Sequence, residues 1–409
     1  MQLVSRMMFC KGTNFQSSPI GKIPQDWEVA ELDSLAEIHD SKRVPLSKME
    51  REDRKGPYPY CGANGIIDYI NDYIFDGEYV LLAEDGGSYG KFENTAYVMN
   101  GKFWVNNHAH ILRAIEGRAS NQFLKTALDF LDLNLYIVGS TRKKLNQERM
   151  REIKIPTPPL TEQRAIVGVL GVVDSAIELA DKVIAKTERL KKGLMQHLLT
   201  HGIGHTEYKD TPIGKMPKLW LVSNLDVVSE VIMGQSPPGE TYNENGEGTP
   251  LINGPTEFGE ENPRKAKWTT NPTKLTKEND VLICVRGHTT GRLSISDGVY
   301  CIGRGVAAIR GLEQSLSNRF LYYVLEENQN KIFQRSYAAG STFPNMTRDQ
   351  LGRVQIPLPS LEEQRKIAEV LASVTHKLQL GRKEQKKLER IKTGLMDLLL
   401  TGKIRIKVD

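Results

Sequence analysis

The sequence predicts an α+β protein organised as an internal repeat with pseudo-twofold symmetry. We expect two tandem α/β domains, separated by two long antiparallel helices that form a coiled-coil-like spacer. The segment Pro19–Trp27 (PIGKIPQDW) returns as Pro212–Trp220 (PIGKMPKLW), and a run ending in Glu-Gln-Arg, followed later by Gly-Leu-Met, also occurs twice. The period of roughly 200 residues is far longer than the ~20–50 residues of a solenoid unit, so it indicates two homologous domains.

Length and composition agree with two domains. A chain of 409 residues exceeds what one hydrophobic core usually supports. Charged residues interrupt every apolar run well before the ~20 residues that a membrane span needs. Arg6 lies inside the N-terminal apolar stretch, which argues against a secretory signal. The four cysteines are scattered without a C-x-x-C pair, so we expect neither disulfides nor zinc, and a cytoplasmic location.

The expected elements follow the order of the chain. Residues 1–17 form an N-terminal extension, 18–157 the first α/β domain and 158–203 the first long helix. Residues 204–358 form the second domain, and 359–409 the second long helix with a C-terminal tail. Inside the domains, Val80–Gly86 aligns with Val281–Gly287, and both read as a buried strand that ends in a glycine-rich turn. That turn carries Asp85 in one copy and Arg286 in the other, so one frame presents two different loop chemistries.

The long helices are predicted from apolar residues that alternate at spacings of three and four. A seam of this kind is unstable alone, and the economical partner is the other copy, lying antiparallel. The seam weakens at Gly381 and Gln385, which we interpret as a kink or a close approach of the backbones. The seam residues are Ile166, Val169, Leu170, Val173, Ile177, Ala180, Ile184, Leu190, Leu194 and Leu198, then Ile367, Val370, Leu371, Val374, Leu378, Leu388, Ile391, Leu395 and Leu398.

Common catalytic signatures are missing from the sequence. There is no G-x-x-x-x-G-K-[ST] loop, no H-E-x-x-H helix and no G-x-S-x-G elbow. His201 and His205 lie in a linker that glycine interrupts, where a helix would not hold them on one face. We therefore predict no catalytic residue, no metal site and no cofactor on this chain.

Three motifs, each present twice, carry a resemblance to a known family. They are P-x-G-x-x-P-x-x-W at the start of each half, I-P-x-P-x-L-x-E-Q-R at the entry to each long helix, and G-L-M-x-x-L-L-T at its end. In this order they resemble the specificity (S) subunit of type I restriction-modification systems, HsdS, over nearly the whole chain.

The resemblance implies a non-catalytic reader of double-stranded DNA. Two target-recognition domains would each bind one half of a bipartite, asymmetric target. The helices would set the spacer and dock two copies of an adenine-N6 methyltransferase (M) subunit, and restriction/translocase (R) subunits would join the complex. AdoMet and ATP are then expected only on these partners, and no membrane is involved. The rival interpretation is a structural adaptor that scaffolds a complex without binding DNA. A stand-alone methyltransferase or nuclease is disfavoured by the missing motifs.

Candidate DNA contacts are polar, basic or aromatic residues in the loops that differ between the copies. Phosphate contacts give affinity and base-edge contacts give specificity. In the first domain they are Lys42, Arg43, Tyr60, Asn64, Asp85, Ser88, Tyr89, His108, Ser140, Thr141, Arg142 and Lys143. In the second they are Gln235, Ser236, Asn253, Arg286, His288, Thr289, Arg304, Ser341 and Thr342, with His108 aligned to Arg304.

Each strong candidate has a structural alternative. Arg286 fits a guanine, because arginine bidentate to guanine is the commonest specific contact, but a salt bridge beside the strand end is the competing interpretation. His108 could be an ordinary loop histidine, and Tyr60 could cover the sheet. Asn64 and Asn253 precede glycine, which is also typical of turns.

A second candidate set serves partner docking or the helix seam. It comprises Glu162, Gln163, Arg164, Ile177, Glu363, Gln364, Arg365 and Leu378. The Glu-Gln-Arg tripeptides have an alternative as plain helix N-termini with an acid in the first turn.

Overall fold

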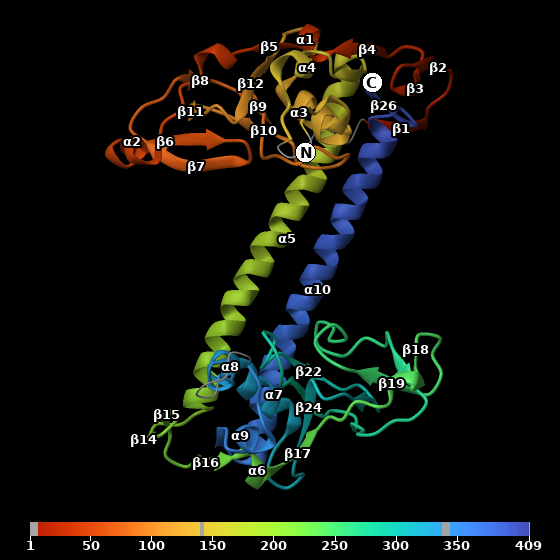
Figure 1. Ribbon diagram of the computed structural model, residues 1–409. Coiled ribbons are helices and arrows are strands. Elements are labelled where there is room, and N and C mark those ends of the chain that lie inside the picture. Colours follow the sequence, from red (N-terminus) through yellow and green to blue (C-terminus); the bar gives the residue numbers. More distant parts are fainter. Residues whose placement is uncertain (1–6, 140–142, 338–343, 409) are drawn as a thin grey trace. The chain divides into compact units, whose positions relative to one another are not determined.

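The computed structural model describes residues 7–139, 143–337 and 344–408 (Figure 1). The chain divides into two compact units. Unit 1 is Met1–Asp181 with Lys383–Asp409, and unit 2 is Lys182–Arg382. The helices α5 (Leu160–His201) and α10 (Leu361–Leu399) each begin in one unit and end in the other. Each unit therefore holds one α/β domain, the start of one long helix and the end of the other.

Unit 1 contains two four-stranded sheets, in the orders β10-β9-β12-β5 and β7-β6-β11-β8. Its central strand β9 is buried along its whole length, as expected for an apolar run with sheet neighbours on both sides. The elements are β1 (Met7–Lys11), β2 (Phe15–Ser18), β3 (Gly21–Pro24), β4 (Glu28–Glu31), α1 (Leu32–Leu35), β5 (Ala36–Ile38), α2 (Lys48–Asp53), β6 (Lys55–Gly62), β7 (Gly65–Ile70), β8 (Phe75–Asp76), β9 (Tyr79–Ala83), β10 (Ala96–Met99), β11 (Lys102–Val105), β12 (Ala109–Ala114), α3 (Asn121–Phe130), α4 (Gln147–Arg151), β13 (Lys154–Thr157) and β26 (Ile404–Val408), with 3₁₀ turns at Asp40–Lys42 and Leu133–Tyr136.

Unit 2 repeats this plan. The order β22-β21-β24-β17 matches β10-β9-β12-β5, and the parallel pair β19–β23 matches β6–β11. The elements are β14 (Tyr208–Thr211), β15 (Gly214–Pro217), β16 (Leu221–Asn224), α6 (Leu225–Val228), β17 (Ser229–Met233), β18 (Tyr242–Asn243), β19 (Thr249–Ile252), β20 (Trp268–Thr269), β21 (Val281–Cys284), β22 (Leu293–Ile295), β23 (Cys301–Ile302), β24 (Val306–Gly311), α7 (Asn318–Glu327), α8 (Gln329–Arg335), α9 (Arg348–Gly352) and β25 (Gln355–Leu358), with a 3₁₀ turn at Gly239–Thr241.

One helix packs on the main sheet of each unit and begins after a serine. Ser120 caps α3 by accepting a hydrogen bond from the Phe123 N–H (3.2 Å), and α7 follows Ser317. The core of unit 1 also contains Met396 and Leu399 from the end of α10. The two long helices are therefore part of the domain cores and are more than a connection between them.

The long helices are antiparallel within each unit. In unit 1, Asp174 pairs with Lys392 (2.7 Å), and Asp181 accepts from Gln385 further along α5. In unit 2, Glu188 pairs with Arg382 (2.7 Å). Residue numbers rise along α5 while those of their partners fall along α10, which confirms the predicted direction.

The gap in the apolar pattern at Gly381 is a close contact. A Cβ placed on Gly381 would lie 3.3 Å from Cγ1 of Ile184, so the glycine makes room for this isoleucine in unit 2. Helix α10 runs through this point without interruption.

Part of the predicted seam is wrong. Leu378 is buried and Ile177 is half-buried, but Leu190 is 54% exposed and Ile391 42% exposed, and Val370 and Leu398 are exposed as well. The reason is that an α-helix advances 3.6 residues per turn, so a pattern read as one continuous seam drifts around the helix. No helix in the described ranges combines the length and apolarity that a bilayer span needs.

Candidate nucleic-acid interface

Four segments of unit 2 meet where its central strands end. The Gln235 N–H donates to the Ile302 carbonyl (2.9 Å), and the Val285 N–H donates to the Gly305 carbonyl (2.9 Å). These bonds hold the turns that follow β17, β21 and β23 together. The predicted residues gathered here are Gln235, Ser236, Asn253, Arg286 and Arg304.

Unit 1 builds the same arrangement. The Glu84 N–H donates to the His108 carbonyl (2.9 Å), and Asn64 Nδ2 donates to the Gly86 carbonyl (3.0 Å). His108 Nδ1 lies 2.6 Å from Asp85 Oδ1. The predicted candidates Asn64, Asp85 and His108 are therefore neighbours.

Asp85 and Arg286 occupy the same position of the repeated fold. The Leu145 N–H donates to the Glu84 carbonyl (2.8 Å), and the Met346 N–H donates to the Val285 carbonyl (2.9 Å). Asp85 then forms an isolated bridge with Lys144, as Arg286 does with Asn345. The alignment of these two strand-end turns by sequence agrees with these bonds.

The predicted alignment of His108 with Arg304 is wrong by one residue. The bond from Glu84 to His108 has its counterpart in the bond from Val285 to Gly305, so Gly305 is in register with His108. Arg304 lies one position earlier, in the turn between β23 and β24. The loops before these strands differ in length, and residue type alone cannot fix the register across them.

Arg286 and Arg304 are exposed. Within residues 7–139, 143–337 and 344–408, neither guanidinium makes a hydrogen bond or an ion pair. The structure thus gives no support to a salt bridge at Arg286. Backbone contacts nevertheless fix both turns: the Arg304 N–H donates to Ser236 Oγ (3.3 Å), and the Gly287 N–H donates to the Pro344 carbonyl (2.9 Å).

A group of five charged residues, the charged cluster, lies beneath the strand-end turn of unit 1. It consists of Asp40, Arg43, Glu84, His110 and Lys144. His110 is fully buried, with Nδ1 2.6 Å from Asp40 Oδ2. Glu84 pairs with Arg43 and with Lys144 (2.9 Å). Arg43 is therefore an internal ion-pair partner, and its predicted role as a direct DNA contact is corrected.

The carboxylates of the charged cluster are held ionised. Burial raises the pKa of Asp40, but the hydrogen bond from His110 and its charge outweigh burial and lower the pKa below its usual range. Burial also raises the pKa of Glu84, but the hydrogen bonds from Lys144 and Arg43 outweigh burial and lower this pKa below its usual range. Asp40, Glu84 and His110 also have ligand atoms within 4.8 Å of one another. A metal ion there would have to displace cations that already pair with both carboxylates.

No sequence pattern indicates that Asp40, Glu84 and His110 belong to one network. The available signal was Glu84, a charged residue directly after a buried strand, where the other copy has Val285. Asp40 and His110 are far apart in sequence, so only the fold shows that they pair.

Two predicted DNA contacts are core residues. Tyr60 is 1% exposed, and its hydroxyl accepts from the Leu46 N–H (2.8 Å). Tyr89 is 2% exposed, and burial raises its pKa to about 12. Neither ring is available to a base, because both complete the packing of unit 1. The alternative interpretation of Tyr60 as a cover of the sheet is the correct one.

The remaining candidates differ in accessibility. Ser140, Thr141, Arg142, Ser341 and Thr342 lie outside the described residues. Asn253 is half-buried against Gly303, where an added Cβ would lie 2.1 Å from Asn253 Oδ1. The exposed candidates are Lys42, Asn64, Ser88, Lys143, Gln235, His288 and Thr289.

The glutamate of each Glu-Gln-Arg tripeptide locks the domain onto its own long helix. Glu162 is buried and accepts from Trp27 Nε1 (3.1 Å), and Glu363 accepts from Trp220 Nε1 (3.0 Å). Glu162 also binds Arg405, whereas Glu363 lies 2.9 Å from His205 Nε2.

The glutamines are also internal. Gln163 Nε2 donates to the Pro158 carbonyl (3.0 Å), and Gln364 Nε2 donates to the Ser315 carbonyl (2.9 Å). A docking role for Glu162, Gln163, Glu363 and Gln364 is therefore corrected: these side chains bond to other parts of the chain, although among the described residues Gln163 Oε1 is buried without a hydrogen-bond partner. Of these tripeptides, Arg164 and Arg365 remain exposed.

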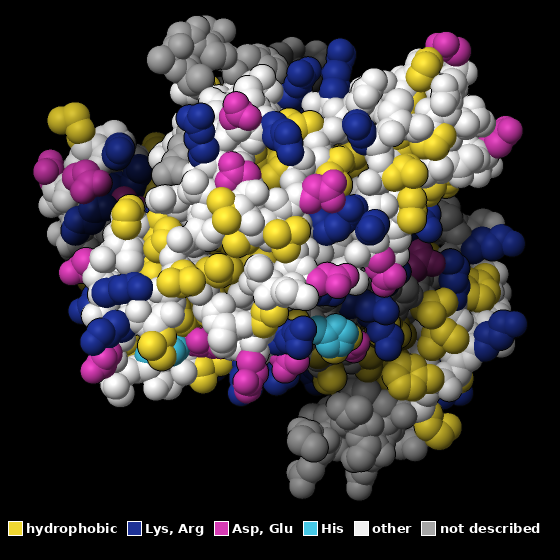
Figure 2. All heavy atoms as spheres, turned by 90° about the horizontal axis from the view of Figure 1, so that it is seen from below, with side chains coloured by type: hydrophobic (Ala, Val, Ile, Leu, Met, Phe, Trp, Pro, Cys, Tyr) yellow, Lys and Arg dark blue, Asp and Glu magenta, His cyan; other side chains and the backbone are white. Residues whose placement is uncertain are grey.

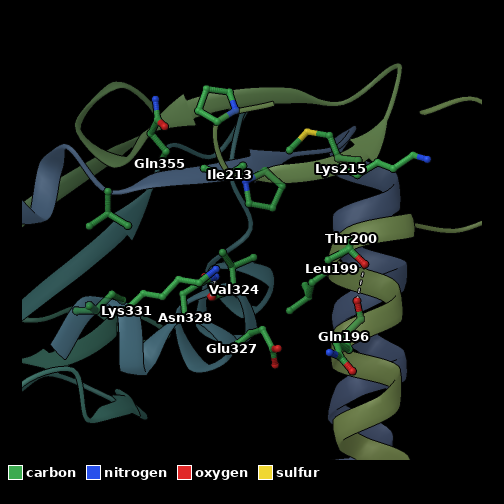
Figure 3. Close-up of a pocket in the computed structure, with 15 residues that line it drawn as sticks. Gln196, Leu199, Thr200, Ile213, Lys215, Val324, Glu327, Asn328, Lys331 and Gln355 are labelled. Carbon is green, nitrogen blue, oxygen red and sulfur yellow. Dashed lines mark hydrogen bonds between the residues drawn. The ribbon is translucent and has the colours of Figure 1, made fainter. Parts of the chain in front are cut away.

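A cavity of about 480 Å³ in unit 2 lies apart from the candidate residues. Figure 3 shows it between the end of α7 and the last turns of α5, beside the β14–β15 hairpin. Its lining includes Ile213 and Gln355. In unit 1 a second cavity is lined by their repeat counterparts Ile20 and Lys154. Both cavities thus belong to the repeated frame.

On the face shown in Figure 2, basic, acidic and apolar side chains are interleaved, and no large area carries charges of one sign.

Comparison with known proteins agrees with the repeat. The family model for the type I restriction modification DNA specificity domain matches twice, over residues 24–189 and 217–390. The chain is 33% identical to the specificity subunit assigned to the type I restriction enzyme MjaX of Methanocaldococcus jannaschii, covering 99% of this chain and 100% of that protein. It is 27% identical to the MjaVIII specificity subunit of the same organism, covering 99% of each chain.

Solved structures share the fold. The crystal structure of a type I restriction-modification S subunit from M. genitalium matches with a TM-score of 0.66 at 17% identity, covering 91% of this chain and 96% of that one. A chain from a structural study of complex assembly and conformational transition in a type I system matches with a TM-score of 0.54 at 24% identity, covering 93% and 99%.

Proposed function

Because this chain belongs to the family of type I restriction-modification DNA specificity subunits, we propose that it is the DNA-reading subunit of such a system. Each unit then binds one half of a bipartite, asymmetric duplex target through the turns at its strand ends. The observation that carries this proposal is the pair Asp85 and Arg286, which have the same backbone bonds and opposite charge. A shared frame with exchanged side chains is what two different half-sites require.

The long helices supply the second part of the proposal, which is docking of two methyltransferase subunits. Exposed apolar residues follow one face of α5 at offsets of 7, 11 and 18 residues, and we name Val172, Leu179, Val183 and Leu190 the α5 stripe. The α10 stripe is Leu380, Ile391 and Leu398, at offsets of 11 and 18. Leu179 and Leu190 correspond to Leu380 and Ile391 in the repeat.

Two similar apolar stripes suit two copies of one partner. Exposed apolar residues in a row on a helix are typical of a binding surface for another helix. We propose that the methyltransferase subunits cover them, that restriction/translocase subunits join through this complex, and that AdoMet and ATP bind to those partners. The chain itself then carries out no chemistry.

Methylation mapping tests the proposal. The chain is co-expressed with its methyltransferase in a host without other adenine methylation, and modified adenines are mapped across the genome. We expect one bipartite motif with a fixed spacer and one methylated adenine in each half. Replacing residues 208–358 by those of a relative should change one half-motif and leave the other unchanged. Binding of the methyltransferase without any sequence-specific methylation would support the adaptor interpretation instead.

A further inference from the structure

We propose that the two units read bases of opposite hydrogen-bonding character at the same position of their folds. In unit 1, the pair Asp85–His108 presents an acceptor to a base that carries an amino group in the major groove, adenine or cytosine. In unit 2, Arg286 and Arg304 present donors to guanine. This inference rests on the proposed function and specifies its substrate at two defined places.

Asp85 and Arg286 occupy positions that match in their backbone contacts. The residue before each, Glu84 or Val285, donates its N–H to the residue just before β12 or β24, and its carbonyl accepts an N–H from Leu145 or Met346. Asp85 and Arg286 therefore leave the sheet at the same point and in the same direction. A difference in their chemistry is then a difference in what each unit presents.

In unit 1 the histidine is oriented by the aspartate. His108 Nδ1 lies 2.6 Å from Asp85 Oδ1, and the side chain of His108 is 41% exposed. A carboxylate can only accept, so Nδ1 donates to Asp85, and in the tautomer that this bond selects the lone pair of Nε2 is an acceptor. The His108 N–H donates to Asn106 Oδ1 (2.8 Å), which fixes the turn that carries the ring.

Two cations near this pair, Arg43 and Lys144, have their own partners. Arg43 is engaged with Glu84 and the Ala109 carbonyl (3.0 Å), and Lys144 with Glu84 (2.9 Å). They neutralise the buried carboxylates of the charged cluster. In the major groove, the amino groups of adenine and cytosine are the base-edge donors that an acceptor can recognise.

In unit 2 the matching position is Arg286, with Arg304 nearby, and both of these side chains offer only donors. A guanidinium has five N–H donors and no acceptor. Arg286 and Arg304 are exposed, and among the described residues no carboxylate pairs with them. Arginine binds guanine O6 and N7 with two parallel hydrogen bonds. The positions of Asp40, Glu84 and His110 in unit 1 are occupied in unit 2 by Met233, Val285 and Ala307, so these three positions place no carboxylate beneath the arginines.

The test selects bound duplexes from a randomised library with the full chain and its methyltransferase, and sequences them. Arg286→Ala and Arg304→Ala should each reduce the preference for a guanine in one half-site, by roughly 5- to 150-fold. Arg286→Lys keeps the charge but not the two-pronged geometry, so it should also lose the guanine preference while binding keeps its salt dependence. His108→Ala should relax an adenine or cytosine in the other half-site only, and the enriched base identifies which of the two is read.

The variant Asp85→Asn distinguishes a role of Asp85 in orienting the His108 ring from a role in the stability of the fold. An asparagine amide can donate to Nδ1, which moves the ring proton to Nε2, so the preferred base should change from one with an amino group to one with a carbonyl oxygen. Thermal unfolding of each variant establishes that the chain is folded. An unchanged preference in Asp85→Asn would overturn the role of the pair.

Failure of this inference differs from failure of the proposed function. If the unmodified chain selects no bipartite motif, the proposed function fails. If it selects one, but Arg286→Ala weakens binding to all sequences equally and lowers the salt slope by about 0.9, then Arg286 contacts phosphate and the guanine assignment is wrong. Loss of both half-sites in either single-unit variant would also contradict the inference.

Discussion

Replacing Glu162 by alanine should destabilise unit 1 strongly, because one buried carboxylate satisfies several donors. Glu162 Oε2 accepts from Trp27 Nε1 (3.1 Å) and from Arg405 Nη2 (2.6 Å), and Oε1 accepts from Arg405 Nε (2.7 Å). Both Glu162 and Trp27 are buried. A buried indole N–H without an acceptor costs about 1–3 kcal/mol.

The lost ion pair adds to this. Breaking a buried ion pair costs about 3–5 kcal/mol. Arg405 keeps Asp26 (2.7 Å) as a second partner, so losing the Glu162–Arg405 pair should cost about 3 kcal/mol or less. We expect a total loss of about 3–5 kcal/mol in the free energy of unfolding. For a unit of this size that corresponds to a fall of roughly 6–20 °C in melting temperature. Glu162→Gln keeps an acceptor for Trp27 and should lose about half as much.

The measurement is calorimetric unfolding of the full chain, with hydrogen exchange to assign each transition to a unit. The matched control is Glu363→Ala in unit 2, where Trp220 loses its acceptor in the same way but the second partner is His205 rather than an arginine. Glu162→Ala should therefore be the more damaging variant. If it lowers stability by less than 1 kcal/mol, or no more than Glu162→Gln does, the clamp is not a stabilising unit and the reasoning fails.

Three further outcomes are expected. The lowered pKa values of the carboxylates in the charged cluster stabilise unit 1 above about pH 4, and this stability is lost as the pH falls through the folded-state pKa values. Hydrogen exchange should show the Leu145 amide losing protection on acidification before its unit 2 counterpart Met346. Equal loss at both amides would contradict this prediction. Gly402→Ala should destabilise unit 1 by more than 1 kcal/mol in chemical denaturation, since its φ is +67° and the new Cβ would lie 2.3 Å from Pro24 Cγ, whereas Gly394→Ala, with open space on α10, should stabilise it by about 0.5–1 kcal/mol. Serine at two positions of the α5 stripe should leave the melting temperature unchanged and reduce co-purification of the methyltransferase at least tenfold, and the docking proposal fails if co-purification is unaffected.

The repeat made much of the architecture predictable. The doubled PIGK and EQR segments indicate two homologous domains, and alternating spacings of three and four indicate the long helices. Direction followed from the need of each seam for a partner. The spacing alone does not show where a long helix stops contacting its partner helix and enters the core of a domain, so it predicts Leu190 and Ile391 in the seam although both are exposed.

Site residues were less predictable for a physical reason. A tyrosine at the end of a strand suits a surface or a core equally well, and only the packing of Tyr60 against the Leu46 backbone decides between them. The sequence around Arg43 predicts a DNA contact, but in the folded chain Arg43 forms an ion pair with Glu84. These pairings join residues far apart in the chain, and they depend on strand order, which local patterns do not encode.

The division of the cores between distant parts of the chain has a consequence for biosynthesis. Unit 2 is one uninterrupted stretch, Lys182–Arg382, but the core of unit 1 needs Met396, Leu399 and Ile406. A ribosome therefore finishes the second unit while the first still exposes the apolar surface that these residues cover. The half that is translated first is completed last, and stalling or premature release near the end of translation would harm the beginning of the protein more than its middle.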